Sequence, residues 1–270
     1  MAQTIFDQGK MVGQSVSING KSIGGSPNLY TNTTTAFPEY PVGTRLVALD
    51  GSVYRYTYFS QICTAGSVIS RDVSETDLLA PIDTALTAAA IGATSIVLTS
   101  ASLYSGAAVA DQYAGGWLIL EAGAGNGYKY RIKSHTAAAA NVVTFTLFDP
   151  LIVAVTTATN VLIMGFPWQT CRMATTTDNL PCGVSLAATA AASYGWVQTW
   201  GPAVCLLDET AGTAAAGSWA TLSDSVEGAV NPAAGSDTSV ADLKTDPFIG
   251  ILQSTGEDTE YTGIHLMLYP

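Results

Sequence analysis

Short runs in which apolar and polar residues alternate recur along most of this chain, and this is the pattern of half-buried β-strands. The run RLVALDGSVYRYTY at 45–58 places Asp50-Gly51 between two such stretches, a pair typical of a hairpin turn. Near the other end, Ile264 and Leu266 alternate with less apolar neighbours in TGIHLMLYP, which predicts a final strand. These patterns favour an all-β fold.

The middle of the chain contains five further runs that are rich in β-branched and aromatic residues. Clusters of Gly, Asn, Asp and Ala separate them, at the spacing typical of a β-sandwich or a small barrel. We expect one compact β module built from TSIVLTSASLY, GGWLILEAG, GYKYRIKSH, NVVTFTLFDPL and VTTATNVLIM.

Strand patterns resume beyond this module. The stretch WVQTWGPAVCLLD places Trp196, Gln198 and Trp200 on one face of an extended strand, and Val197 and Thr199 on the other. A second β region is therefore expected to follow the module.

The patterns divide the chain into four parts. We expect an extended N-terminal arm at 1–41, two halves of a main β domain at 42–81 and 166–270, and an inserted β-barrel-like module at 82–165. One helix signal, SETDLLAPI at 74–82, has a capping residue but meets a proline within a turn or two. The predicted fold is all-β, made of short-stranded β-sandwich or small β-barrel modules with little helix.

The N-terminal arm is rich in Gly, Pro, Asn and Thr, and it lacks the 3.6-residue apolar period of a helix. Within it, Asn19-Gly20 predicts a two-residue hairpin turn. Arms of this composition either lie across a neighbouring subunit or form a flexible terminus. If the arm contacts a neighbour, Tyr30, Phe37 and Tyr40 are its candidate contact residues.

Charge is scarce and unevenly placed. Only 11% of the residues are charged, whereas globular domains average about 25%. A surface of Ala, Thr, Ser and Gly suits close contact with other copies or with a neighbour, so the composition favours permanent assembly.

Most of the net charge of −11 comes from 208–270, where ten acidic residues accompany one base, Lys244. We interpret this acidic end as solvated surface rather than as a metal site. Because phosphate backbones require a basic face, nucleic-acid binding is not expected.

The cysteines do not indicate a metal site. Cys63, Cys171, Cys182 and Cys205 include no CxxC pair and no zinc-type spacing, although an even count would permit two disulfides. The first residues, MAQTIFDQGK, lack the basic-then-apolar layout of a secretory signal. We therefore expect reduced thiols and assembly in a cytoplasm.

Three long uncharged runs, at 84–110, 150–171 and 179–207, exceed the about 18 residues that indicate a membrane helix. Polar or turn-forming residues interrupt each of them, so no membrane span is expected.

Two glycine-rich motifs are better explained by turns than by phosphate binding. GKS at 20–22 lacks the first glycine of a P-loop, because Ser15 occupies that position. GAGNG at 123–127 leads into a strand pattern rather than a helix, so we interpret it as a hairpin loop with residues at positive φ.

No residue set for catalysis stands out. His135 and His265 lie in strand-like contexts without a GxSxG, HExxH or Cys-His signature, so surface or core roles are expected. Carboxylates are numerous and no spacing selects a pair, for example Asp50 with Glu121 or Asp242 with Asp246. The sequence predicts no enzyme, no catalytic residue, no cofactor and no metal.

The tryptophans have two interpretations. Aromatic platforms stack on sugar rings, but aromatic side chains also anchor β cores and subunit interfaces, and the low charge favours the second role. Trp196 and Trp200 are therefore candidate interface residues, among Trp117, Trp168, Trp196, Trp200 and Trp219.

Several of these patterns together resemble a known family. The strand YGWVQTWG at 194–201 precedes short β segments, an Ile-Gly pair at 249–250 and the last apolar strand. This arrangement resembles the closing part of decoration, or cement, proteins of tailed-phage capsids. The middle module, with IGATSIVLT, YAGGWLILEAGAGNGYKYRI and VTFTLFDPL, resembles the β-barrel insert of virion proteins from marine and cyanobacterial phages. Across roughly 42–270 the matched residues are Gly116, Gly125, Gly127, Tyr130, Arg131, Ile132, Asp149, Pro150, Trp196, Gln198, Gly201, Gly228 and Gly250.

The resemblance implies a homotrimer on the outer surface of the capsid, with the major capsid protein as its partner and without nucleic-acid or membrane contacts. The expected function is that of a structural virion protein that stabilises the capsid by bridging its subunits. A phage tail fibre, a receptor-binding protein or another virion β-adhesin is the alternative.

Overall fold

The computed structural model describes residues 28–30, 38–71, 87–99, 110–139, 142–176, 180–209, 214–233 and 247–270, and the backbone of four short strands before them. Every regular element in these residues is a β-strand, so the predicted all-β fold is confirmed. The chain forms two compact units, which we call the main unit (1–72 with 170–270) and the inserted unit (73–169). The module expected at 82–165 lies inside the inserted unit.

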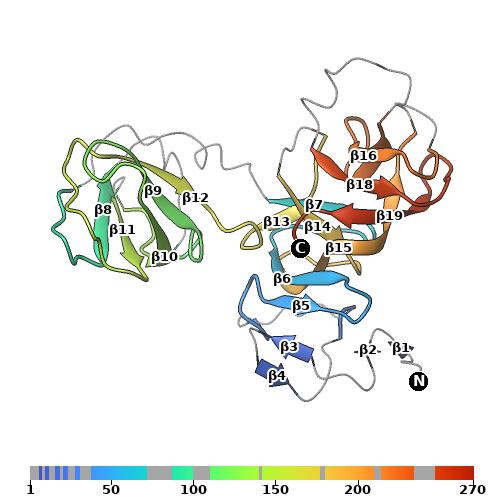
Figure 1. Cartoon of the computed structure of the whole chain (residues 1–270), viewed down its shortest axis with the longest axis horizontal. Coiled ribbons are helices and arrows are strands. Elements are labelled where there is room, and N and C mark those ends of the chain that lie inside the picture. The colour runs from blue at the N-terminus through green and yellow to red at the C-terminus, as the bar shows by residue number, and fades with distance from the viewer. Residues whose placement is uncertain are drawn as a thin grey trace. The chain divides into compact units, whose positions relative to one another are not determined.

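The inserted unit contains a five-stranded antiparallel sheet in the order β12-β9-β10-β11-β8 (Figure 1). Each of the five runs predicted to form strands contains one, so this prediction is confirmed. The strands are β8 (Ser95–Thr99), β9 (Trp117–Ala122), β10 (Lys129–His135), β11 (Val142–Leu147) and β12 (Asn160–Met164).

Backbone hydrogen bonds beyond the sheet give this unit the form of a small barrel. The N–H of Thr87 donates to the carbonyl of Val97 in β8 (2.9 Å), and the N–H of Ala89 donates to the carbonyl of Val155, ahead of β12 (3.0 Å). The segment with Thr87 and Ala89 therefore covers the edge of β8. A covered edge does not offer unpaired backbone groups to another chain.

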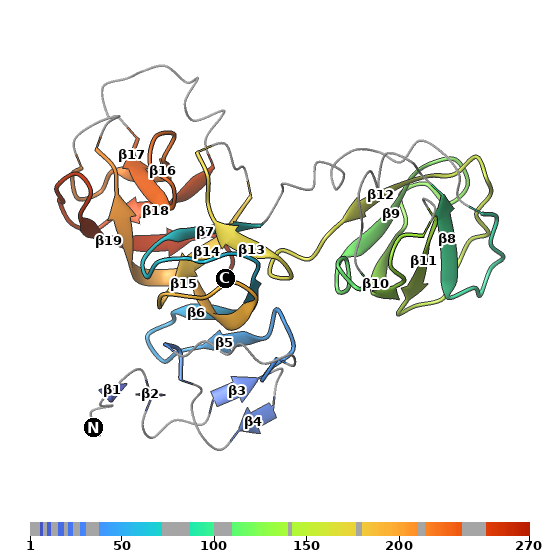
Figure 2. The same ribbon diagram turned by 180° about the vertical axis from the view of Figure 1, so that it is seen from behind.

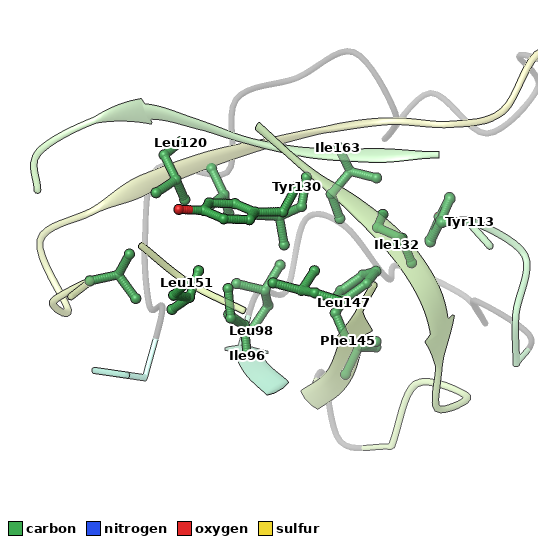
Figure 3. Close-up of a cluster of buried hydrophobic side chains, with 14 residues drawn as sticks. Ile96, Leu98, Tyr113, Leu120, Tyr130, Ile132, Phe145, Leu147, Leu151 and Ile163 are labelled. Carbon is green, nitrogen blue, oxygen red and sulfur yellow. The ribbon is translucent and has the colours of Figure 1, made fainter. Parts of the chain in front are cut away.

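Alternation along the strands fills the barrel with apolar side chains. In β10 the exposed Lys129, Arg131 and Lys133 alternate with the buried Tyr130 and Ile132. Figure 3 shows side chains from opposite walls pointing toward one another across the interior. Each large side chain buried in this way contributes about 1.5–3 kcal/mol. The cluster comprises Ile96, Leu98, Tyr113, Leu118, Leu120, Tyr130, Ile132, Val143, Phe145, Leu147, Leu151, Val155, Val161 and Ile163.

The glycine-rich stretch between β9 and β10 is a hairpin loop, as predicted. Gly123, Gly125 and Gly127 have φ values of 84°, 81° and 85°, which residues with a side chain rarely adopt. The N–H of Gly127 donates to the carbonyl of Leu120 (2.8 Å), which extends the ladder up to the loop. Turn geometry thus accounts for the glycine spacing.

The main unit is organised around one long strand, β15 (Ser193–Leu207), which belongs to two closed rings of strands. Its first half pairs with β6 and β14 in the ring β15-β14-β7-β13-β6. Its second half pairs with β19 and β17 in the ring β15-β19-β18-β16-β17, which we call the second ring. Figure 2 shows β16, β17 and β18 grouped together, away from β6 and β5.

The strands of the two rings are short except for β15. The predicted strand at WVQTWGPAVCLLD is β15 and the predicted last strand is β19, so both predictions are confirmed. The other bounds are β6 (Val53–Phe59), β7 (Val68–Arg71), β13 (Cys171–Met173), β14 (Pro181–Ser185), β16 (Trp219–Leu222), β17 (Ala229–Pro232), β18 (Phe248–Leu252) and β19 (Tyr261–Met267).

The two halves of β15 meet at an irregularity beside Gly201. The register with β6 shifts between Gln198 and Trp200, and Gly201 has a φ of 92°. A Cβ at this position would lie 2.9 Å from Oγ and 3.0 Å from Cα of Ser52. Backbone conformation and lack of space therefore both require glycine where the strand exchanges one set of partners for the other.

Both hairpins predicted near the N-terminus are confirmed. β3 (Val16–Ile18) pairs with β4 (Lys21–Ile23), and Ile18 lies opposite Lys21, while Asn19 and Gly20 lie outside the described residues. Lys21 and Ser22 of the GKS motif belong to β4.

β5 (Arg45–Val47) pairs with β6 across the loop that contains Asp50-Gly51. Leu46 and Ala48 are buried whereas Val47 is exposed, as the alternation predicts. A further pair, β1 (Phe6–Asp7) with β2 (Lys10–Met11), completes the strands. The helix signal at 74–82 lies outside the described residues.

Two residues at the end of the predicted N-terminal arm, Leu29 and Tyr40, pack into the core of the main unit. Leu29 is 7% exposed and lies in a core cluster with Tyr56 and Trp196. The ring of Tyr40 packs against the same cluster, 5.3 Å from the ring of Tyr56. Apolar contacts thus attach this segment to β6 and β15, a tertiary effect that a local Gly- and Pro-rich pattern does not reveal.

Candidate functional site

The five candidate contact residues differ widely in exposure. Tyr30 is 55% exposed, while Tyr40 and Trp200 are half-buried. Trp196 is 3% exposed and packs against Tyr40, with ring centroids 5.4 Å apart, so almost none of its surface is open to a partner. Phe37 lies outside the described residues. Tyr30, and in part Tyr40 and Trp200, retain the surface that an intermolecular contact needs.

An exposed aromatic pair that the sequence did not select as a contact lies on the second ring. Trp219 in β16 is 54% exposed and Phe248 in β18 is 38% exposed, with ring centroids 6.0 Å apart at 74°. Ile251 lies directly opposite Trp219 in the ladder, so the two side chains share a face. Neither β16 nor β18 contains a charged residue. We call Trp219, Phe248 and Ile251 the β16–β18 patch.

A pocket of about 540 Å³ opens in the main unit at the side of β15, β6 and β14. Tyr30, Tyr54 and Tyr261 contribute aromatic rings to it, and Gln198 contributes a primary amide. The other lining residues are small or apolar, and none of the lining residues is charged at neutral pH. This volume lies within the range of about 300–1,000 Å³ found for small-molecule sites.

His135 is buried and has a partner at each ring nitrogen. Its Nε2 accepts a hydrogen bond from the N–H of Tyr113 (2.9 Å), so Nδ1 carries the proton and donates to the carbonyl of Thr136 (2.8 Å). Burial lowers the pKa of His135 below its usual value, although the carbonyl of Thr136 and the charge of Asp111 oppose this effect. The imidazole is a satisfied core group rather than a general base facing a cleft.

The four cysteines are buried and unbonded. Sγ of Cys171 lies 3.5 Å from Sγ of Cys182, which is a contact and not a disulfide. Burial raises the pKa of Cys63 and Cys205, and burial together with Cys182 raises that of Cys171 further. These are features of structural thiols rather than of reactive nucleophiles.

Among the acidic residues of 208–270 that the structure describes, Asp224, Glu227, Glu257, Asp258 and Glu260 are exposed, Glu209 is half-buried and Asp208 is buried. Asp208 is fully buried, and its Oδ2 accepts hydrogen bonds from the hydroxyls of Ser223 (2.6 Å) and Ser225. The hydroxyl oxygen of Ser223 accepts a bond from the N–H of Val226 (2.8 Å). This carboxylate therefore fixes the turn between β16 and β17.

Of the two carboxylate pairs named as examples, only Asp50 with Glu121 lies within the described residues. Asp50 belongs to the main unit and Glu121 to the inserted unit, while Asp242 and Asp246 lie outside the described residues. Within the described ranges, no three His, Cys, Asp or Glu side chains gather as a metal site would require. In the same ranges, no helix has the length and hydropathy needed to cross a membrane.

Similarity to known proteins gives no further information about this site. No family model matches the chain, and no curated protein or solved structure is significantly similar to it. The function must therefore be argued from the geometry described above.

Proposed function

We propose that this protein is a non-catalytic structural component of a virus particle, which decorates the outer surface of a phage capsid and bridges its major capsid subunits. The observation that carries the proposal is the β16–β18 patch. Trp219 and Phe248 together expose aromatic surface on a pair of strands without charge. Contiguous exposed apolar surface of this kind is typical of interaction sites.

The composition agrees with a permanent contact. With 11% charged residues, the chain has less charge than a freely diffusing domain usually carries. Aromatic residues are enriched at interfaces and charged residues are depleted from interface centres. A protein that binds the assembled shell, and not its free subunits, stabilises the assembled state by linkage. The shell as partner and the trimer remain proposals, supported by the resemblance of 194–270 to decoration proteins.

A binding experiment with particles that lack this chain tests the proposal. We expect the purified protein to co-sediment with such particles, and a double variant, Trp219→Ser with Phe248→Ser, to bind at least about tenfold more weakly, or about 1.4 kcal/mol. Leu49→Ser is the matched control, because Leu49 is 75% exposed in the loop between β5 and β6. It should bind like the wild type. Failure of the wild type to bind would refute shell decoration, and equal binding by the double variant would exclude this patch.

A second candidate function is that of a receptor-binding or tail-fibre adhesin. The observation that favours it is the tyrosine-lined pocket, which a purely bridging protein does not need. Copy number separates the two candidates, since fibres are present in far fewer copies than capsid subunits.

A further inference from the structure

The pocket presents aromatic surface together with unused hydroxyls. Tyr30 and Tyr261 are each 55% exposed, and neither hydroxyl has a hydrogen-bond partner among the described residues. A Cβ placed on Gly66 would lie 2.6 Å from Cε1 of Tyr261, so only glycine allows the Tyr261 ring to lie against this loop. The third ring belongs to Tyr54, whose pKa burial raises to about 12, although a side-chain hydrogen bond with Ser52 opposes this effect.

Gln198 gives the pocket an oriented acceptor. Its Nε2 donates to the carbonyls of Trp200 (3.1 Å) and Pro202 (2.7 Å), which holds the amide in one orientation. Its Oε1 accepts no hydrogen bond from the described part of the chain. The residue is 4% exposed, so the amide is a fixed element of the pocket and not a mobile surface group.

These features define the chemistry of a ligand. A charged ligand would lose water without finding an opposite charge, because no lining residue is charged. A pure hydrocarbon would leave the Gln198 oxygen and the tyrosine hydroxyls unsatisfied, which is also unfavourable. A neutral sugar ring has an apolar face for aromatic contact and hydroxyls that donate and accept, so it satisfies both requirements.

We infer that this pocket binds a neutral sugar unit, with Tyr30 and Tyr261 as aromatic contacts and Gln198 Oε1 as the acceptor for a sugar hydroxyl. This site goes beyond shell decoration and does not depend on it. None of the three residues of the β16–β18 patch lines the pocket, so the two surfaces share no residue.

Saturation-transfer NMR with the full-length protein tests the inference. The probes are the methyl glycosides of glucose, galactose and mannose, N-acetylglucosamine, and short oligomers of these sugars, with glucuronate and glucosamine as charged comparators. We expect saturation of at least one neutral sugar and none of the charged pair. If oligomers bind more strongly than single sugars, the site accommodates a glycan chain. If they bind equally, the site holds one sugar unit. Both results support the inference.

Variants locate the site. Tyr261→Ala and, independently, Tyr30→Ala should each weaken sugar binding at least about fivefold, because a contact in the site is worth about 1 kcal/mol or more. Tyr128→Ala is the control, since Tyr128 is 42% exposed in the inserted unit, outside the pocket lining. Near-ultraviolet circular dichroism checks that each variant is folded.

Three results would overturn the inference. One is the absence of saturation for every neutral sugar at millimolar concentration, and another is unchanged binding by both folded pocket variants. The third is binding of a proline- and tyrosine-rich peptide but of no sugar, which would assign the pocket to a protein partner. None of these results depends on particle binding, so shell decoration stands or fails separately.

Discussion

Trp196 illustrates at the residue scale how alternation predicts a face but not its use. The pattern grouped Trp196 with Gln198 and Trp200, yet the register shifts between Gln198 and Trp200, and one of the three is a core ring, one lines a pocket and one is half-buried. What decides between these roles is the packing of Leu29 and Tyr40 onto the same face, and both come from distant sequence. Neither contact has a local signal.

Trp196→Ala should lower the free energy of unfolding by about 3–5 kcal/mol, because the buried ring leaves a cavity among apolar neighbours. Trp219→Ala is the control, since the 54% exposed Trp219 loses far fewer contacts. Denaturant unfolding of both variants measures the difference. Similar losses for the two variants would contradict the core role of Trp196.

His135 predicts a pH dependence of stability. Its pKa in the folded protein is lowered by burial, so the unfolded chain binds a proton more readily than the folded chain. The free energy of unfolding should therefore be largest above the ordinary histidine pKa of about 6.5 and decrease as the pH falls below it. Protonation would also leave Nε2 unable to accept the hydrogen bond from Tyr113.

Chemical denaturation between pH 7.5 and 5 measures this effect. His135→Gln cannot take up a proton, so its unfolding free energy should depend less on pH in this interval, whatever its absolute stability. An identical slope for variant and wild type would show that His135 does not contribute.

The thiols should be unreactive until the protein unfolds. Burial raises the pKa of Cys63, Cys171 and Cys205, and the thiolate is the reactive form. A thiol reagent such as dithionitrobenzoate should label almost none in the native protein and all four after denaturation without reductant. Two reactive thiols after denaturation would instead show that one disulfide is present, and peptide mapping would then test whether it joins Cys171 and Cys182, whose sulfurs are in contact.

At the scale of elements, sequence reasoning succeeded where the signal is local. The five strands of the inserted unit and the hairpins β3–β4 and β5–β6 follow from alternation and turn residues. The double role of β15 could not be predicted, because ring closure joins segments such as Cys171 and Phe59 that lie far apart in sequence. The pocket could not be predicted either, because its lining includes residues of β6, β14, β15 and β19, which long-range pairing brings together.

A substitution at Gly201 tests the irregular point at which β15 stops pairing with β6 and pairs with β19. Gly201→Ala should destabilise the protein by about 1–3 kcal/mol or more, because it combines positive φ with a clash against Ser52. Gly217→Ala is a matched control, since Gly217 has the same φ of 92° but nothing within 4 Å of a Cβ. The difference between their unfolding midpoints isolates the clash. Equal destabilisation would mean that Ser52 can move aside without cost.

At the scale of the whole molecule, the chain combines a sheet-based scaffold with little surface charge. The inserted barrel buries a core of its own, and the main unit buries two clusters, one of which joins strands of both rings. What remains outside includes the uncharged β16–β18 patch, a surface better explained by a permanent partner than by free diffusion. The composition predicts assembly from the sequence alone, and the β16–β18 patch is the contact surface that we propose for it.

The copy number of this chain in purified virus particles tests the proposed function most directly. Densitometry of a protein gel, or quantitative mass spectrometry, compares it with the major shell protein. Decoration of the capsid predicts a ratio comparable to that of the shell protein. A ratio far below it would favour the adhesin, and absence of the chain from the particles would contradict the virion assignment altogether.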